Sequence, residues 1–396
     1  MSEARISLKS KKDRSLERRH PWVFSGAIKA IEGFPEDGDV VSVHANKGRF
    51  LGRGLFSSQG SISVRVLTFE DEPVDTELFV SRIRKAAETR RTIGLPDAGQ
   101  TEIYRLLHAE GDGMPGCIVD VYGDTAVFQA HDIGVHRMKE TIASAIIEAS
   151  NGSIQRVYDR SADTLPKAFS EGLERGYIVG DGESSGVFLE HGHRFHVDWG
   201  AGQKTGFFID QRENRLALSR LSKGKRVLNT FCYTGGFSVY ALAAGASVVH
   251  SLDSSQKALD LAEENVRLNG FDDERHKCIK ADAVEYVRNL EESYDIIVLD
   301  PPAFAKGMRS RHNAIQGYKR LNGHAIRQLK PGGILMTYSC SQVVTPAIFR
   351  DTIVAAAIHQ GREVKILEQL HQPGDHPISI FHPEGEYLKG LVLQVY

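Results

Sequence analysis

Strand-like and helix-like patterns of apolar residues alternate most regularly in the second half of the chain, from about residue 205. Apolar runs typical of buried strands occur at residues 226–231, 247–252, 277–281, 295–300 and 333–338. Helical patterns separate them, at residues 236–244, 255–269, 283–292, 314–329 and 346–360. Such strict alternation predicts an α/β fold with a parallel, doubly wound sheet. Later apolar runs at 364–367 and 388–395 could add two strands.

The first half of the chain has a different pattern. Short apolar runs bounded by turn residues, at 40–43, 50–56 and 62–67, predict a small β-rich module. The polar, proline-containing stretch 70–73 breaks the pattern, and an amphipathic helix is predicted over 76–93. Strand-like runs at 116–122 and 126–130 then accompany a helical stretch near 136–149. We therefore expect three domains, at residues 1–75, 76–200 and 201–396.

Composition fits a globular protein. The 396 residues are 41% hydrophobic and 25% charged, and no run approaches the roughly 18 consecutive apolar residues of a membrane helix. The polar, basic N-terminus shows no secretory signal. The four cysteines include no CxxC pair, which disfavours a zinc site or a disulfide framework, so no metal and a cytoplasmic location are expected.

Positive charge is concentrated at the N-terminus. Residues 1–30 contain eight Lys or Arg and three acidic residues, a surplus of five, whereas the remainder carries −7. A basic arm that includes Arg18 and Arg19 suits a polyanionic partner such as RNA, although a solvated basic terminus is an equally good interpretation of the charge alone.

The first strand of the alternating region leads into a loop of small residues. Neither a GxGxxG fingerprint nor a P-loop is present, so nothing in the loop demands a phosphate. Asp253 and Asp282 end the next two predicted strands, where carboxylates can bind a ribose and an adenine amine. This order suits S-adenosylmethionine. Alternatively, either aspartate only caps the following helix. The expected cofactor contacts are Asn229, Phe231, Tyr233, Thr234, Gly235, Gly236, Asp253, Ser254, Asp282 and Pro301.

Two further segments follow predicted strands, Asp300-Pro301-Pro302-Ala303-Phe304 and Ser339-Cys340-Ser341. If those strands are neighbours in a parallel sheet, a carboxylate, an aromatic ring and a thiol share one crevice. That combination suits chemistry on a flat heterocycle.

Residues 205–396 resemble the Rossmann-like class I S-adenosylmethionine-dependent methyltransferases. The whole chain, from residues 19–26 (RHPWVFSG) to residues 384–390 (EGEYLKG), is similar to the bacterial 23S ribosomal RNA cytosine-C5 methyltransferases with an N-terminal PUA domain. The resemblance includes the linker 202–212 (GQKTGFFIDQR), which borders the cofactor cleft in that family and adds Gln211 and Arg212 to the expected contacts. It implies an RNA-binding β-barrel at residues 1–75, and 23S ribosomal RNA, the large subunit or its precursor as partner. A homodimer is compatible with the sequence.

Cytosine C5 methylation explains the thiol and the carboxylate. Attack of a thiolate on carbon 6 makes carbon 5 nucleophilic, so Cys340 is the expected nucleophile and Asp300 the group that binds the N3/N4 edge. A buried, inert core cysteine is the alternative. Cys117, Cys232 and Cys278 are expected to be structural. The family often has a second cysteine in the Asp-Pro-Pro-like motif; this chain has none, so no residue is assigned to remove the carbon-5 proton.

Other polar groups surround these motifs. Phe304 could stack on a flipped base, and a loop beside the crevice could grip phosphates. The expected RNA contacts are Pro302, Phe304, Lys306, Arg309, Arg311, Arg18 and Arg19. The loop residues could equally be only solvated. Glu384 and Glu386 are interpreted as surface carboxylates, and His191, His193 and His196 as alternating strand residues rather than metal ligands.

Two other functions compete with this one. An aromatic residue after Asp-Pro-Pro also occurs in enzymes that methylate amines, so methylation of a guanine or amine nitrogen, or of uridine C5, is an alternative. The other is a non-catalytic RNA-binding factor in ribosome assembly. The complete set of Gly, Asp, Asp and Asp-Pro-Pro favours an enzyme.

Overall fold

The computed structural model describes residues 3–271, 274–305 and 307–396, which form two compact units. The first unit comprises residues 1–188, 197–209 and 374–385, and the second residues 189–196, 210–373 and 386–396. Within the described ranges, no helix combines the length and the apolar character that a membrane crossing requires.

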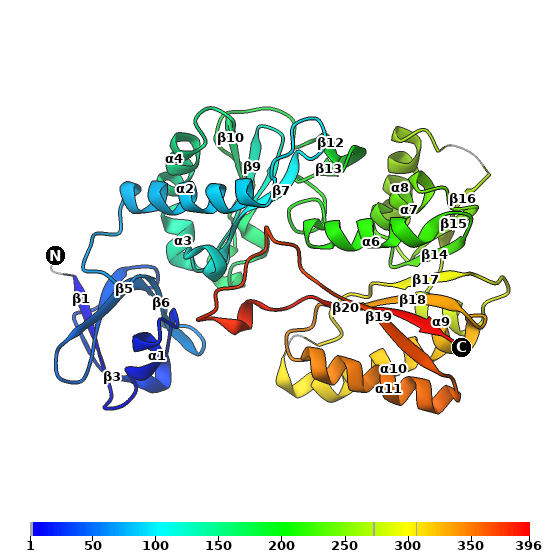
Figure 1. The fold of residues 1–396 in the computed structure, drawn as a ribbon. Coiled ribbons are helices and arrows are strands. Elements are labelled where there is room, and N and C mark those ends of the chain that lie inside the picture. The colour runs from blue at the N-terminus through cyan, green and yellow to red at the C-terminus, as the bar shows by residue number, and fades with distance from the viewer. Residues whose placement is uncertain (1–2, 272–273, 306) are drawn as a thin grey trace. The chain divides into compact units, whose positions relative to one another are not determined.

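The first unit begins with a small curled sheet in the strand order β2-β6-β5-β4-β1-β3 (Figure 1). Alternating apolar residues such as Ile6, Val41 and Val64 fill its core. Its elements are β1 (Ala4–Leu8), α1 (Arg14–Glu17), β2 (Trp22–Phe24), β3 (Ile28–Glu32), β4 (Val40–His44), β5 (Phe50–Phe56) and β6 (Ile62–Thr68).

A five-stranded sheet of order β11-β10-β9-β8-β7 follows, with α2 and α4 packed against each other. The side chain of Asp75 accepts a hydrogen bond from the Leu78 backbone and so starts α2. The elements are α2 (Thr76–Thr92), β7 (Ile103–His108), β8 (Cys117–Tyr122), β9 (Thr125–Ala130), α3 (Ile133–Arg137), α4 (Lys139–Ala149), β10 (Arg156–Asp159), α5 (Lys167–Ser170) and β11 (Gly176–Val179). The hairpin of β12 (Ser185–Glu190) and β13 (His193–Asp198) contributes residues to both units.

One late segment of the chain belongs to the first unit. Residues 374–385 lie between two strands of the second unit, yet Asp375 accepts a hydrogen bond from the Arg105 backbone at 2.9 Å. The buried guanidinium of Arg90 binds the Asp375 carbonyl at 2.7 Å and pairs with Asp112. The core of the first unit is therefore completed by residues that are synthesised late.

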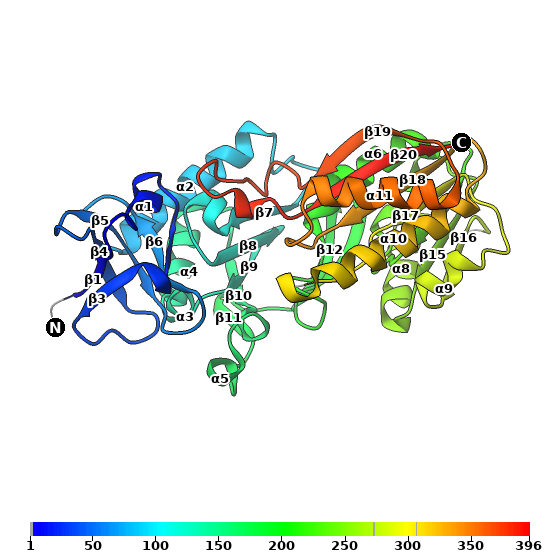
Figure 2. The same cartoon turned by 90° about the horizontal axis from the view of Figure 1, so that it is seen from below.

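The second unit is a seven-stranded sheet of order β16-β15-β14-β17-β18-β20-β19. Helices α6–α8 lie on one face and α9–α11 on the other (Figures 1 and 2). The elements are α6 (Arg212–Ser222), β14 (Arg226–Thr230), α7 (Gly236–Ala243), β15 (Val248–Asp253), α8 (Gln256–Leu268), β16 (His276–Lys280), α9 (Ala283–Arg288), β17 (Ile296–Leu299), α10 (Arg311–Gln328), β18 (Gly333–Ser339), α11 (Pro346–Gln360), β19 (Val364–His371) and β20 (Lys389–Val395).

The predicted fold class is confirmed, with one correction to the sheet. Strands β14 to β18 are parallel, whereas β20 is antiparallel to both β18 and β19. The sheet is therefore mixed, because the last two strands have no crossover helix between them. The sheet extends from β14 in both directions: β15 and β16 lie on one side of it, and β17 and β18 lie on the other. The carboxyl end of β14 is thus the switch point at which such sheets bind ligands.

Candidate active site

The loop after β14 has an unusual backbone. Left-handed φ values occur at Phe231 (54°), Tyr233 (45°) and Gly235 (76°), and residues other than glycine seldom adopt them. The Tyr233 N–H donates to one carboxylate oxygen of Asp253 at 3.1 Å, and Ser255 N–H donates to the other at 2.9 Å. Asp253 therefore holds the loop in shape. Backbone strain at a switch point is typical of a ligand site.

Close packing brings the start of α7 against α8. A Cβ atom on Gly235 would lie 2.9 Å from the Cβ of Ala262, and the Thr234 carbonyl accepts a hydrogen bond from Asn265 at 2.8 Å. Gly236 is buried beside the side chain of Arg215. Packing alone therefore requires glycine at both positions, and their contact with a cofactor remains a prediction.

Asn229 offers a buried acceptor at the end of β14. Its amide nitrogen donates to the Ser238 hydroxyl at 2.9 Å, whereas its Oδ1 accepts no hydrogen bond from the described residues. A buried acceptor of this kind is costly unless a ligand or water satisfies it. It fits the ammonium group of S-adenosylmethionine, the cofactor expected from the sequence.

The two acidic residues of the crevice differ in their local roles. Ser255 caps α8 by accepting from Ala258 N–H, so the helix-cap interpretation is wrong for Asp253. Asp282, which is exposed, does cap a helix, because it accepts from Glu285 N–H at 2.9 Å at the start of α9. Since a carboxylate has two oxygens, this cap leaves one for a ligand. The predicted contact Ser254 is exposed next to Asp253.

The two motif segments lie at the ends of paired strands. In the parallel pairing of β17 and β18, Leu299 is opposite Thr337, so Asp300 and Cys340 follow at the same edge of the sheet. Both are partly exposed. The Ser341 hydroxyl joins the segments because it lies 3.0 Å from the Tyr318 hydroxyl and accepts from Ala305 N–H at 3.4 Å.

The Asp-Pro-Pro turn presents its aromatic residue to α10. Pro301 is buried and Pro302 is exposed. The Phe304 ring lies 4.6 Å from the Tyr318 ring with a tilt of 35° and packs beside Gly317. One face of Phe304 is thus used for packing, and stacking on a base would require another part of the partly exposed ring.

Lys389, a residue that the sequence did not single out, contacts the segment after Cys340. It opens β20 and is 6% exposed, and its Nζ donates to the carbonyls of Ser341 and Val344, both at 2.7 Å. The sequence signal that could have identified it is a lysine inside an apolar run, because a buried ammonium needs hydrogen-bond acceptors or a negative charge nearby.

The other cysteines have structural surroundings. Cys117 and Cys232 are buried, and burial raises the pKa of both thiols. Burial also raises the pKa of Cys278 to about 12. Thiols in such surroundings are poor nucleophiles at neutral pH.

The predicted RNA contacts lie in both units. Arg309 is exposed and Arg311 begins α10, whereas Lys306 lies outside the described residues. In the first unit, Arg18 and Arg19 are exposed. Arg19 lies 3.8 Å from Glu70, an exposed ion pair that stabilises the protein little and can yield to phosphate.

Gln211 and Arg212 are buried at the start of α6. Gln211 accepts a hydrogen bond from the Asn214 side chain at 2.6 Å, and Arg212 donates to Glu213 at 3.1 Å. In the preceding linker, the Thr205 hydroxyl donates to Asp120 of the first unit at 2.6 Å. Contact of Gln211 and Arg212 with the cofactor remains a prediction.

Alternation along a strand does not explain all three histidines near residue 193. His193 and His196 lie on β13, but His191 lies in the preceding turn with a φ of 46°, so the prediction is wrong for it. His196 binds Glu264 at 2.7 Å.

His20, His382 and Glu384 form the one group in the described part of the chain whose spacing could suit a metal. However, Trp22 N–H donates to Nδ1 of His20 at 3.2 Å, which places the proton of the neutral ring on Nε2. That nitrogen faces Glu384 at 3.4 Å. The arrangement is that of a hydrogen bond rather than of a metal ligand.

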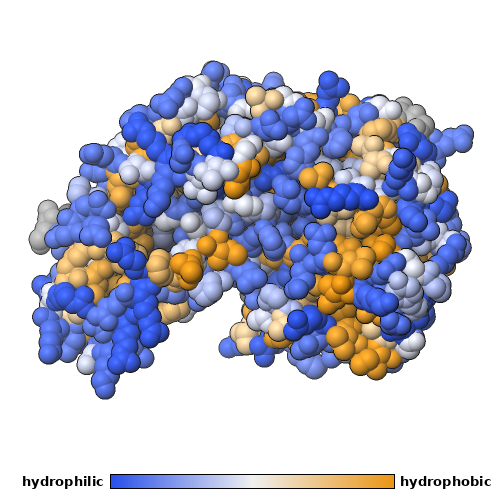
Figure 3. Space-filling model, viewed as in Figure 1, coloured by the Kyte–Doolittle hydropathy of each residue, from blue (hydrophilic) through white to orange (hydrophobic). Residues whose placement is uncertain are grey.

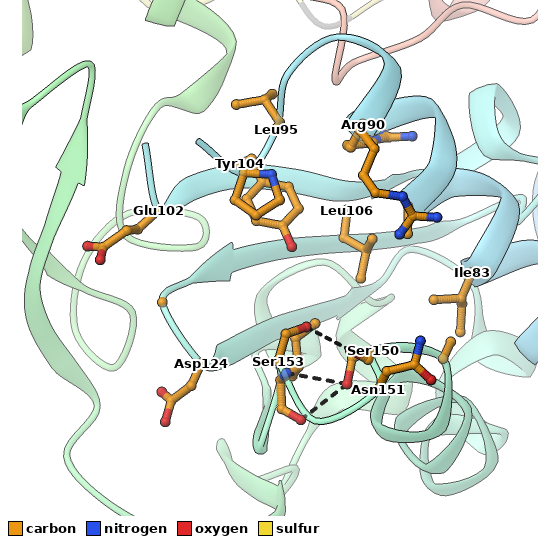
Figure 4. Close-up of a pocket in the computed structure, with 16 residues that line it drawn as sticks. Ile83, Arg90, Leu95, Glu102, Tyr104, Leu106, Asp124, Ser150, Asn151 and Ser153 are labelled. Carbon is orange, nitrogen blue, oxygen red and sulfur yellow. Dashed lines mark hydrogen bonds between the residues drawn. The ribbon is translucent and has the colours of Figure 1, made fainter. Parts of the chain in front are cut away.

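A cavity of about 370 Å³ lies in the first unit (Figure 4). Ile83, Leu106 and Tyr104 give it apolar walls, with Glu102 and Asp124 at one side. None of the predicted site residues is among its lining, so it has no evident part in methyl transfer.

Apolar side chains are exposed on α11 and on the edge strand β19 (Figure 3), namely those of Val354, Ile358, Ile366 and Leu367. An exposed apolar patch of this kind is compatible with association. The homodimer remains a prediction.

Comparison with protein families gives two matches. A model described as S-adenosylmethionine-dependent methyltransferase matches residues 171–391, and a PUA-like domain model matches residues 6–69. Together they cover the curled sheet and the whole crevice, and they confirm the predicted cofactor.

Curated relatives match along their whole length. A protein of Aeromonas salmonicida named ribosomal RNA large subunit methyltransferase I is 42% identical, with 98% of each chain covered. One of Shewanella denitrificans with the same name is 41% identical, with 99% of each covered.

Solved structures share the fold. A Streptococcus mutans protein, provisionally named a SAM-dependent methyltransferase, has a TM-score of 0.84 at 22% identity, over 98% of this chain and 99% of that one. A structure of a methyltransferase complexed with SAH has the same TM-score at 23% identity and full coverage of both chains. The chain therefore belongs to the family of S-adenosylmethionine-dependent methyltransferases that includes the proteins named ribosomal RNA large subunit methyltransferase I.

Proposed function

We propose that this protein methylates carbon 5 of a cytosine in 23S ribosomal RNA through a covalent adduct of Cys340 with carbon 6. The observation that carries the proposal is the link through Ser341, which joins the segments after Asp300 and around Cys340 at one edge of the sheet. The names of the relatives support large-subunit ribosomal RNA as the substrate.

The thiolate and the carboxylate divide the work. The sulfur of Cys340 forms a bond to carbon 6, and the displaced ring electrons make carbon 5 nucleophilic. Asp300 binds the N3/N4 edge of the base and stabilises the ring as this charge develops. After methylation, loss of the carbon-5 proton to a base returns the electron pair that expels the Cys340 thiolate.

S-adenosylmethionine, when bound, supplies the electrophilic methyl group. The residues that would hold it are those at the ends of β14, β15 and β16. Asn229 offers an acceptor for the ammonium group, Asp253 acceptors for ribose hydroxyls, and Asp282 an acceptor for the adenine amine. Pro301 would line the site from β17.

Each unit offers basic side chains for RNA. Arg18 and Arg19 offer phosphate contacts on the PUA-like module, and Arg309 and Arg311 offer them beside the crevice. Phe304 would stack on the flipped cytosine. These contacts, the three-domain division and a cytoplasmic site of action are parts of the same proposal.

The test is a trapping experiment. Ribosomal RNA that contains 5-fluorocytidine should form a complex with the enzyme and S-adenosylmethionine that survives denaturation, because fluorine blocks the final elimination. Cys340→Ala should form none, whereas the matched control Cys278→Ala should trap normally. Normal methylation by Cys340→Ala would contradict the covalent mechanism and favour methylation of a nitrogen.

The modified base is identified separately. Mass spectrometry of nucleosides from cells that lack the gene should show loss of one 5-methylcytidine in large-subunit RNA. Loss of a methylated guanosine or of 5-methyluridine instead would refute the cytosine assignment, and an unchanged RNA would favour a non-catalytic role.

A further inference from the structure

Lys389 is an unusual lysine because its ammonium group is enclosed by protein. The residue is paired with Ser339 in the ladder between β18 and β20. Its two hydrogen bonds go to the carbonyls of Ser341 and Val344, so Nζ spans the turn that follows Cys340. Both of these hydrogen bonds end on neutral carbonyl oxygens, and the carboxylate of Glu386 acts on the ammonium only through its charge. Neither hydrogen-bond partner therefore neutralises the charge of Lys389.

The charge of Lys389 is coupled to that of the candidate nucleophile. Burial lowers the pKa of Lys389 to about 8, while negative charge on Cys340 and on Glu386 raises it. Coupling between two titrating groups is reciprocal, so the ammonium must favour the thiolate as much as the thiolate favours the ammonium. Other titratable groups near this turn, among the described residues, include Tyr318 on α10 and Asp300 at the end of β17.

A helix N-terminus does not supply this charge. The helix that follows Cys340, α11, begins at Pro346 as predicted, six residues beyond the cysteine. Its first turn is capped by the side chain of Thr345, which accepts from Ile348 N–H at 3.3 Å. Since the influence of a helix dipole fades within about one turn, Lys389 is the better placed source of positive charge.

We propose that Lys389 is a positioning residue that fixes the turn after Cys340 and favours the thiolate form of that cysteine. The inference rests on the proposed function of Cys340. The S–H bond breaks with its electron pair left on sulfur, the proton goes to water, and the ammonium keeps its own protons and its two carbonyl partners. Lys389 itself forms no bond with the substrate.

The test measures alkylation of Cys340 by iodoacetamide in the full-length protein, without RNA or cofactor, from pH 5.5 to 9.5. Mass spectrometry of the peptide that carries Cys340 separates it from the other cysteines. In the wild-type protein, the pH of half-maximal rate should lie below the value of about 8.5 for a free thiol. A value at or above 8.5 overturns the proposal without any substitution.

Variants then assign the effect to Lys389. Lys389→Met keeps the length of the side chain without its charge, and should raise the pH of half-maximal rate by about one unit, a roughly tenfold loss of rate at pH 7. Lys389→Arg keeps the charge and should retain most of the shift. An identical profile in Lys389→Met and the wild-type protein would overturn the proposal. Thermal melting and S-adenosylmethionine binding check that the variants fold.

Failure of this inference and failure of the proposed function are distinguishable. Alkylation requires neither RNA nor methyl transfer. If Cys340→Ala still methylates RNA, the covalent mechanism is wrong whatever the alkylation shows. If Cys340→Ala is inactive but the alkylation profile of Cys340 is the same in Lys389→Met and the wild-type protein, the mechanism stands and Lys389 is only structural.

Discussion

The hydroxyl groups of Ser341 and Tyr318 lie 3.0 Å apart beneath the crevice, and the same serine oxygen accepts from Ala305 N–H. Beyond the pairing of β17 with β18, one small side chain therefore links the segment that carries Asp300 to the segment that carries Cys340. Ser341 is fully buried, so water cannot replace either contact.

We expect Ser341→Ala to separate the two segments. The loss of a buried hydrogen-bond partner should cost about 1–2 kcal/mol of unfolding free energy and reduce kcat for methylation at least tenfold. The KM for S-adenosylmethionine should change less than kcat, because all the predicted cofactor contacts except Pro301 lie outside these two segments. Tyr318→Phe, which removes one of the two contacts, should fall between Ser341→Ala and the wild-type protein. Unchanged kcat in both variants would refute the role.

Gly235→Ala should damage the cofactor loop. The new Cβ would lie only 2.9 Å from the Cβ of Ala262, and alanine would have to adopt the left-handed φ of 76°. We therefore expect a destabilisation of about 1–3 kcal/mol and a loss of cofactor affinity. Gly270→Ala is the matched control because its φ is 78° but no atom lies within 4 Å of the added Cβ. Denaturant melts and calorimetry would measure both. Equal effects at the two positions would show that strain alone matters.

Asp253 and Asp282 should be separable by substitution. Asp253→Asn loses the charge that holds Tyr233 N–H and should weaken S-adenosylmethionine binding at least tenfold. Asp282→Ser keeps a cap for α9 and tests the adenine contact alone, whereas Asp282→Ala should also cost about 1 kcal/mol of stability. Calorimetric titration distinguishes the outcomes. Full affinity in Asp282→Ser would remove Asp282 from the cofactor site.

Asp159 should make the first unit acid-sensitive. Its burial alone would raise the pKa, but hydrogen bonds from His136, Ser161 and Lys139 outweigh this and lower it to about 2. Because the folded pKa is below the unfolded value of about 3.9, the stabilisation is complete above pH 4 and is lost as the pH falls to 2. Asp159→Asn should abolish about 2 kcal/mol of this pH dependence. Unfolding measured from pH 2 to 7 tests it, and an unchanged slope would contradict it.

Arg18 and Arg19 should contribute to RNA affinity without choosing the base. Replacing both with alanine should weaken RNA binding and lower the slope of log affinity against log salt by about one to two. Lys223→Ala with Lys225→Ala removes the same charge from exposed positions in the second unit and serves as the control. Filter binding at several salt concentrations gives both slopes. Equal slopes in the two double variants would contradict a specific role for the arm.

The sequence predicted most of the second unit because its apolar periods are local. The runs that became β14 and β18 and the helices that became α8 and α11 lie within one or two residues of their predicted positions. The antiparallel course of β20 was not predictable from its own residues, since strand direction depends on what precedes it in space. The crossing of residues 374–385 into the first unit was hidden for the same reason.

Site residues were predictable where chemistry and strand ends coincide, as for Cys340 and Asp253. The left-handed backbone at Phe231 and Tyr233 was not, because nothing in an aromatic side chain favours that conformation. Lys389 was missed because it contributes through a partner 48 positions earlier in the chain, which only the sheet brings near.

The late segment that completes the first unit bears on how the protein is made. Arg90 and Arg105 belong to an early part of the chain, yet their partner Asp375 leaves the ribosome only after β19 has been translated. The usual order, in which an N-terminal domain folds while the rest is still being synthesised, is therefore interrupted here. In a nascent chain that ends before this segment, Arg90 would lack its hydrogen bond to the Asp375 carbonyl. The first unit can therefore reach its full set of contacts only when translation is nearly complete.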